Sequence, residues 1–125
     1  MLCRVHKDER IVEVIFIGLV TKEIALSELK NLYDQLRAQQ VSGYHLLVDL
    51  TQGESDIVFA EMMDVVHLLR KQTLGFEKIG VLCETPLNYG TSRMFQLLYR
   101  EKQSNIKIDS SRESLISWMM FADTP

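Results

Sequence analysis

Short apolar runs alternate along this chain with longer stretches whose apolar residues recur at helical spacing. The runs have the length and β-prone composition of strands, and they lie at Leu2 to His6, Ile11 to Ile17, His45 to Leu50, Ile79 to Cys83 and Asn105 to Ile108. Three- and four-residue spacing predicts helices at Lys22 to Gln39, at Asp56 to Gln72, after the strand within Lys78 to Lys102, and at Leu115 to Phe121. The expected order is therefore ββαβαβαβα.

The order of these elements predicts an α/β fold. The polar tetrapeptide from Lys7 to Arg10 separates the first two strands, which favours an N-terminal hairpin. Gly18 and Thr21 are expected to end the second strand and begin the first helix. The three following βα units predict a mixed, mostly parallel sheet of about five strands with helices on both faces.

Length and composition limit the architecture and the partners. A chain of 125 residues with 46% hydrophobic content is the size of one domain, so we expect residues 1–125 to form a single unit. A net charge of -3 argues against binding nucleic acid or an anionic membrane through bulk electrostatics. No apolar run is long enough to cross a bilayer, and the chain opens without a signal-peptide core. We therefore expect no integral membrane association and a cytoplasmic location, which the widely spaced Cys3 and Cys83 also fit.

The junction between the fourth strand and the third helix is the most informative local signal. Thr85 is a good helix cap, and Pro86 suits the first helical position, where no amide donor is required. The junction places Cys83 and Tyr89 at the carboxyl end of a strand, where open α/β sheets usually bind ligands.

The chain resembles the SpoIIAA-like family, whose STAS fold is shared by anti-sigma factor antagonists and likened to the CRAL-TRIO lipid-binding domain. Four segments carry the resemblance: IFIGLVTKE at Ile15 to Glu23, HLLVDLT at His45 to Thr51, GVLCETPLNYGTSRMFQLL from Gly80, and IKIDSSRESLISWM at Ile106 to Met119. The resemblance implies a single STAS-like domain with a regulatory or binding role.

One functional feature of that family does not carry over to this chain. Anti-sigma factor antagonists are phosphorylated on a serine in an Asp-Ser-Ser-Gly turn at the start of the second helix. This chain reads ESDIVFAEMM there, so Ser55 precedes Asp56, no glycine follows, and Val58 and Phe59 occupy the region of that serine. We therefore expect no phosphorylation switch of that type.

A ligand pocket is expected where the strands ending near Asp49 and Cys83 meet the second and third helices. Its predicted lining comprises Asp49, Thr51, Phe59, Met62, Met63, Cys83, Tyr89, Arg93 and Met94. The methionines offer adaptable apolar surface, and Tyr89 with Arg93 offers a place for an anionic head group. An ordinary core and a solvated helix face are the simpler interpretations of the same residues.

Catalytic and metal-binding patterns are weak. Cys83 faces the start of a helix, which favours a thiolate, but Glu84 opposes it and no histidine is near in the sequence. Asp64, His67 and Glu61 share one side of a helix, yet ligands from a single helix do not close a metal site. We expect no catalytic residues, no cofactor and no metal.

The favoured function is a non-enzymatic regulatory or binding module that acts through protein contact or through a small apolar ligand. The first alternative is a carrier of a lipid or acyl-like molecule, and the second is a thiol-dependent enzyme that uses Cys83. A homodimer is also expected, because the apolar arc from Val58 to Leu69 is wide and because apolar side chains crowd Trp118 to Phe121.

Overall fold

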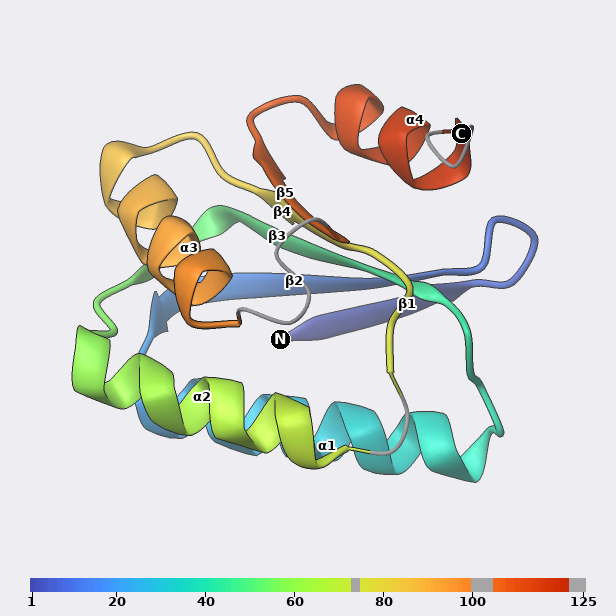
Figure 1. Ribbon diagram of the computed structural model, residues 1–125, viewed down its shortest axis with the longest axis horizontal. Helices are drawn as coiled ribbons and strands as arrows, with labels where there is room; N and C mark the ends of the chain where they lie inside the picture. Colours follow the sequence, from blue (N-terminus) through green and yellow to red (C-terminus); the bar gives the residue numbers. More distant parts are fainter. Residues whose placement is uncertain (73–74, 100–104, 122–125) are drawn as a thin grey trace.

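Five strands form one mixed sheet in the order β1-β2-β3-β4-β5 in the computed structural model, which describes residues 1–72, 75–99 and 105–121 (Figure 1). β1 pairs with β2 in antiparallel fashion, and the other pairs are parallel, which confirms the predicted hairpin and mixed sheet. The strands are β1 (Leu2–His6), β2 (Ile11–Val20), β3 (His45–Ser55), β4 (Ile79–Leu82) and β5 (Ile106–Asp109).

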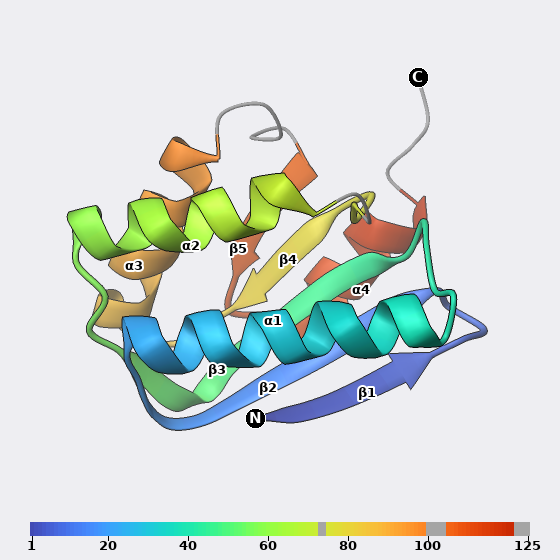
Figure 2. The same cartoon turned by 90° about the horizontal axis from the view of Figure 1, so that it is seen from below.

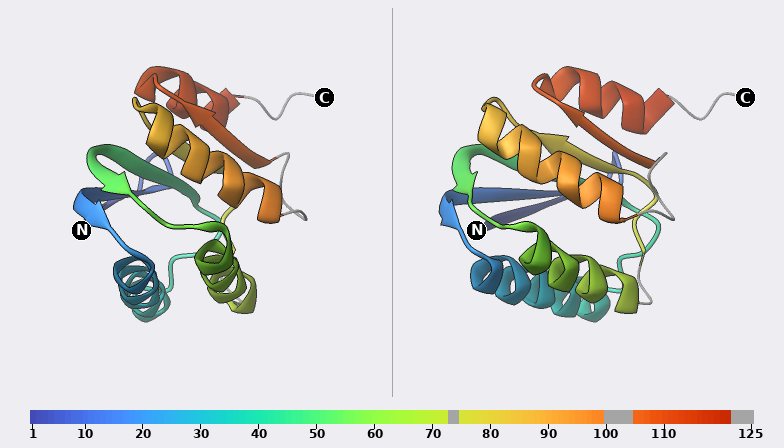
Figure 3. Two further views of the ribbon diagram at one scale, coloured as in Figure 1. Left: turned by 90° about the vertical axis from the view of Figure 1, so that its left-hand side faces the viewer. Right: turned by 60° about the vertical axis from the view of Figure 1, so that its left-hand side comes forward.

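Helices cover both faces of the sheet, as predicted. They are α1 (Lys22–Ala38), α2 (Phe59–Lys71), α3 (Pro86–Leu98) and α4 (Arg112–Phe121). Figure 3 shows α1, α2 and α3 on one face and α4 on the other. Seen from below, α1 and α2 lie side by side, and α3 borders α2 (Figure 2).

Each face of the sheet has its own apolar core. The larger core joins α1, α2 and α3 to one set of alternating strand residues, among them Val14 and Leu46. The smaller core joins α4 to the opposite set and contains Ile11, Leu47, Leu82, Leu115 and Met119. The wide apolar arc of α2 is largely covered, because this helix packs against both α1 and α3.

Hydroxyl side chains cap the amino ends of three of the helices. Thr21 Oγ1 accepts from the backbone N of Ile24 to begin α1, and Thr85 Oγ1 accepts from that of Asn88 to begin α3. Pro86 occupies the start of α3, so the predicted strand–turn–helix junction is confirmed. At α4 the capping oxygen is Ser111 Oγ, which accepts from the backbone N of Ser114 at 3.2 Å.

Two strands extend further than the sequence pattern predicted. β2 continues through Gly18 to Val20 instead of ending at Ile17, and β3 continues to Ser55 instead of ending at Leu50. The two extensions pair with each other after an irregularity in register between Ile15 and Ile17. Gly18, which was expected to end the strand, adopts a positive φ of 79° but stays paired with Gly53 of β3. The pairing between β2 and β3 therefore outweighs the local tendency of glycine to end a strand.

Three helix boundaries also differ from the predicted ones by three or more residues. α2 begins at Phe59 rather than Asp56, because residues 56–58 connect the extended β3 to the helix. α4 begins at Arg112 rather than Leu115, directly after its Ser111 cap. α3 ends at Leu98, and the predicted helical residues 100–102 lie outside the described residues.

Candidate functional site

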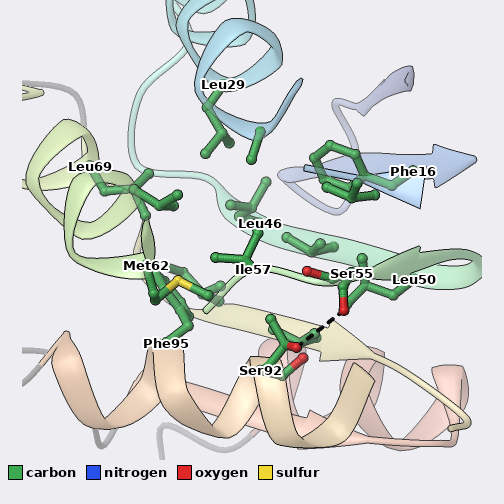
Figure 4. A pocket seen from close by; sticks show the side chains of 17 residues that line it. Phe16, Leu29, Leu46, Leu50, Ser55, Ile57, Met62, Leu69, Ser92 and Phe95 are labelled. Carbon is green, nitrogen blue, oxygen red and sulfur yellow. Dashed lines mark hydrogen bonds between the residues drawn. The ribbon is translucent and has the colours of Figure 1, made fainter. Parts of the chain in front are cut away.

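An apolar cavity of about 110 Å³ lies inside the larger core, between the sheet and the three helices on that face (Figure 4). Each neighbouring element contributes to its wall: Phe16 from β2, Leu29 from α1, Leu46 from β3, Met62 and Leu69 from α2, Val81 from β4, and Phe95 from α3. Protein interiors are close-packed and contain few voids larger than a water molecule. A cavity of this size, lined by side chains of the larger core, is therefore a candidate binding site.

The extended end of β3 closes one side of the cavity, and α3 holds that end in place. β3 outruns its partner β4, since their pairing stops at Asp49 and Leu82. Beyond that point the side chain of Asn88, a residue that is 1% exposed, makes the hydrogen bonds to β3 that a longer β4 would make. Its Nδ2 donates to the carbonyl oxygens of Leu50 at 3.1 Å and Gly53 at 2.9 Å, and its Oδ1 accepts from the backbone N of Ser55 at 3.0 Å.

Among the described residues 1–72, 75–99 and 105–121, only three polar side chains line the cavity, and each carries a hydroxyl group. They belong to Ser55, Thr91 and Ser92. Thr91 Oγ1 lies 3.2 Å from the Leu87 carbonyl oxygen and 3.5 Å from that of Ser55; Figure 4 draws the second contact. Ser92 Oγ donates to the carbonyl oxygen of Asn88 at 2.7 Å.

The cavity wall differs from the lining predicted from sequence, of which only Met62 takes part. Asp49 and Thr51 lie on the opposite face of the sheet, because Asp49 follows Leu47, which packs under α4. The Asp49 carboxylate accepts from the backbone N of Thr51 at 2.8 Å and from its hydroxyl at 2.6 Å. These two polar side chains therefore bind each other and face away from the cavity.

The remaining predicted residues lie outside the cavity wall. Phe59 and Tyr89 are 61% and 52% exposed, because they occupy the first turns of α2 and α3 where these helices leave the sheet edge. Arg93 is also exposed and binds the side-chain oxygen of Gln96 on its own helix. Met63 and Met94 are partly buried, and Met94 packs against the larger core. The proposed head-group pair of Tyr89 and Arg93 does not border the cavity.

Cys83 belongs to the larger core but does not border the cavity either. Burial raises the pKa of its thiol, although a hydrogen bond with Ser92 opposes that effect. The thiol is therefore protonated at neutral pH, which does not favour Cys83 as a nucleophile. The structure favours its simpler interpretation as a small apolar core residue.

Acidic side chains near the predicted metal-binding face have other partners. Asp64 pairs with Lys22 at 3.3 Å, and the Glu61 carboxylate accepts from the backbone N of Val58 at 3.1 Å. Within the part of the chain that the structure describes, no three His, Cys, Asp or Glu side chains are grouped closely enough to hold a metal ion.

Glu13 is, besides Asp49, a second buried carboxylate on the α4 face of the sheet. Glu13 of β2 is 4% exposed, and it contacts His6 Nε2 at 2.9 Å and Arg112 Nη2 at 3.3 Å. Burial raises the pKa of Glu13, but the hydrogen bonds and charges of His6 and Arg112 together outweigh burial and hold the pKa below its ordinary value. The cluster links β1, β2 and α4 on the face opposite the cavity.

Sequence reasoning missed the polar residues that shape the cavity, although α3 carries a signal for them. Asn88, Thr91, Ser92 and Phe95 have the spacing of one helix face, and all four are buried. Polar residues at positions where apolar ones are expected mark a buried polar contact. Tyr89 and Arg93, which were predicted to line the pocket, lie on the exposed side of the same helix.

No protein-family model matches the chain, and neither the curated proteins nor the solved structures contain a match. None of the described helices has the length and apolar character needed to span a membrane.

Proposed function

We propose that this chain is a non-enzymatic binding module that takes up a small apolar molecule in the cavity beneath α1, α2 and α3. The observation that carries this proposal is a cavity of about 110 Å³ with an almost wholly apolar wall. An engineered cavity of ~150 Å³ with a similar lining, in another protein, stays dry and binds benzene or xenon. A ligand would regain dispersion contacts that the empty cavity lacks. Such a role agrees with the binding function that the SpoIIAA-like resemblance implies.

The size of the cavity favours a small ligand over a lipid. Pockets for drug-sized molecules typically occupy ~300–1,000 Å³, whereas this cavity measures about 110 Å³. An acyl chain would require the helices to separate from the sheet, but a ring of about six carbons would require little movement. The carrier hypothesis is therefore the weaker one.

The proposal can be tested by NMR with methyl-labelled methionine, since the chain offers an internal control. Met62 borders the cavity, and Met119 lies in the smaller core on the other face of the sheet. Titration with benzene is expected to shift the Met62 methyl resonance and to leave that of Met119 unchanged. Equal shifts at both methyls, or none at either, would contradict the proposal.

A cavity-filling variant makes this test sharper. Ala25 of α1 is 5% exposed and borders the cavity, so Ala25→Leu adds three carbon atoms to that space. We expect Ala25→Leu to abolish the benzene-induced shift at Met62. The matched control is Ala38→Leu at the exposed end of α1, which should bind benzene like the unmodified protein.

Self-association is a second candidate, favoured by apolar side chains at the edge of the sheet where the parallel strands end. These apolar side chains come from the end of β2 and from the starts of α2 and α3, and each is about half exposed or more. They are Ile17, Leu19, Val58, Phe59, Leu87 and Tyr89. Exposed apolar patches of this kind often mark contact surfaces. Ser55 and Ile57 border the cavity next to Val58, so one segment would connect a ligand to a second copy of the chain.

Sedimentation equilibrium tests self-association directly. Phe59→Asp places a charge in the centre of the proposed contact and should shift a dimer toward monomer. Leu97→Asp, on the far end of α3, is the control and should leave the equilibrium unchanged. A single species near 14.5 kDa at high protein concentration would refute the dimer.

A further inference from the structure

One hydroxyl group in the cavity wall has no hydrogen-bond partner among the described residues. Ser55 Oγ is buried, and the Ser55 residue as a whole is 3% exposed. Its backbone is held on both sides, since its N donates to Asn88 and its carbonyl oxygen lies 3.5 Å from Thr91 Oγ1. Buried polar groups are nearly always paired, so an unpaired hydroxyl at a fixed position indicates a missing partner.

Unlike Ser55 Oγ, the two neighbouring hydroxyl groups have backbone carbonyl oxygens to which they can donate. Ser92 Oγ donates to the carbonyl oxygen of Asn88 at 2.7 Å, and Thr91 Oγ1 lies within hydrogen-bond reach of the Leu87 carbonyl oxygen at 3.2 Å. Both are bonds to the preceding helical turn, so each oxygen keeps its lone pairs for accepting, although Ser92 Oγ also contacts the Cys83 thiol. This end of the cavity therefore offers one free donor at Ser55 and acceptors on α3.

The cavity wall also determines the charge of its ligand. No Asp, Glu, Lys, Arg or His borders it within the described ranges 1–72, 75–99 and 105–121. A carboxylate or ammonium group placed there would lose its water without gaining a counter-ion, which is strongly unfavourable. A neutral polar group would lose far less and would regain a hydrogen bond.

From these three observations we infer that the cavity selects a small neutral molecule with one hydroxyl or carbonyl oxygen, which accepts a hydrogen bond from Ser55 Oγ. The apolar part of the ligand would lie among Leu29, Met62 and Leu69. This inference rests on the proposed function, and it specifies which ligands the site prefers. A hydroxyl ligand can also donate to Thr91 or Ser92, whereas a carbonyl ligand uses the Ser55 hydrogen bond alone.

Phenol and toluene form a suitable pair of probes, because they have nearly the same shape and differ in one polar group. Their dissociation constants are measured from the Met62 methyl shift in the unmodified protein, in Ser55→Ala and in Ser110→Ala. Ser110 is exposed and does not line the cavity, so its variant controls for the loss of a serine hydroxyl. We expect Ser55→Ala to weaken phenol relative to toluene by roughly 2- to 10-fold, the effect of one net hydrogen bond. Ser110→Ala should leave that ratio unchanged.

Each alternative outcome has a distinct meaning. If toluene binds but the phenol-to-toluene ratio is the same in Ser55→Ala, a trapped water satisfies Ser55 Oγ, and the inference fails while the proposed function stands. If benzoate at neutral pH binds as tightly as phenol, the requirement for a neutral ligand is wrong. If neither phenol nor toluene shifts the Met62 methyl, the proposed function itself fails.

Folding of the variant provides an independent check. Removing an unpaired buried hydroxyl relieves a desolvation cost, so unliganded Ser55→Ala should be at least as stable as the unmodified protein. A clear loss of stability in urea unfolding would show that Ser55 Oγ already has a partner in the empty protein, and it would overturn the inference.

Discussion

Replacing Asn88 by alanine should destabilise the fold more than any ordinary surface substitution on α3. Asn88 provides the hydrogen bonds that a longer β4 would otherwise provide to the end of β3. In Asn88→Ala, the carbonyl oxygens of Leu50 and Gly53 and the backbone N of Ser55 lose their side-chain partner. The contacts to Leu50 and Ser55 are fully buried, and the one to Gly53 is partly accessible.

The expected magnitude follows from those burials. A buried donor or acceptor left without a partner costs ~1–3 kcal/mol, and water can reach a partly exposed carbonyl at little cost. Two buried groups therefore give a loss of about 2–6 kcal/mol, and partial relaxation of the strand end places our expectation near 3 kcal/mol. That is a large fraction of the ~5–15 kcal/mol by which native proteins are stable.

Urea unfolding followed by far-UV circular dichroism measures this loss, and two further variants identify its cause. Asn88→Asp keeps the side-chain shape but turns a carboxylate oxygen toward two carbonyl oxygens, so at neutral pH it should cost at least as much as alanine. Asn31→Ala on the exposed face of α1 is the control and should change stability by less than about 0.5 kcal/mol. A loss below about 1 kcal/mol for Asn88→Ala would refute the reasoning, since it would show that Asn88 is dispensable.

Two other predictions concern the face under α4. The pKa of Glu13 is depressed in the folded protein, so its contribution to stability is present above its ordinary value of 4.5 and is lost as the pH falls through the folded value. Glu13→Gln should therefore be less stable than the unmodified protein at neutral pH, with the difference shrinking in acid; a constant difference across urea titrations at several pH values would contradict this. A Cβ at Gly80 would lie 2.7 Å from Met119 Cε and 3.3 Å from Leu115 Cδ2, and both side chains are fully buried, so Gly80→Val should cost ~1–3 kcal/mol by overpacking. Gly90→Ala, where nothing lies within 4 Å, should be neutral or stabilising, and equal thermal shifts for the two variants would argue against the packing explanation.

Local patterns in the sequence determined the order and type of the elements. The spacing of Ala25, Leu29, Leu32 and Leu36 produces an amphipathic helix in any α/β context, and α1 buries all four. Thr85 and Pro86 begin α3 as predicted, because a cap acts on amides within its own turn. Such signals act over three or four residues, so they can be read without knowledge of the rest of the chain.

The tertiary structure decided where the strands end and where the cavity lies. β2 and β3 extend beyond their apolar runs because each satisfies the other's backbone and because Asn88, 33 residues after Ser55, completes the hydrogen bonding. Asp49 and Met62 were predicted to share a pocket, but strand alternation places Asp49 on the face opposite Met62. A cavity is the space left between side chains from distant elements, and its position depends on how α1, α2 and α3 pack together over the sheet. Only the assembled core therefore shows which residues surround it.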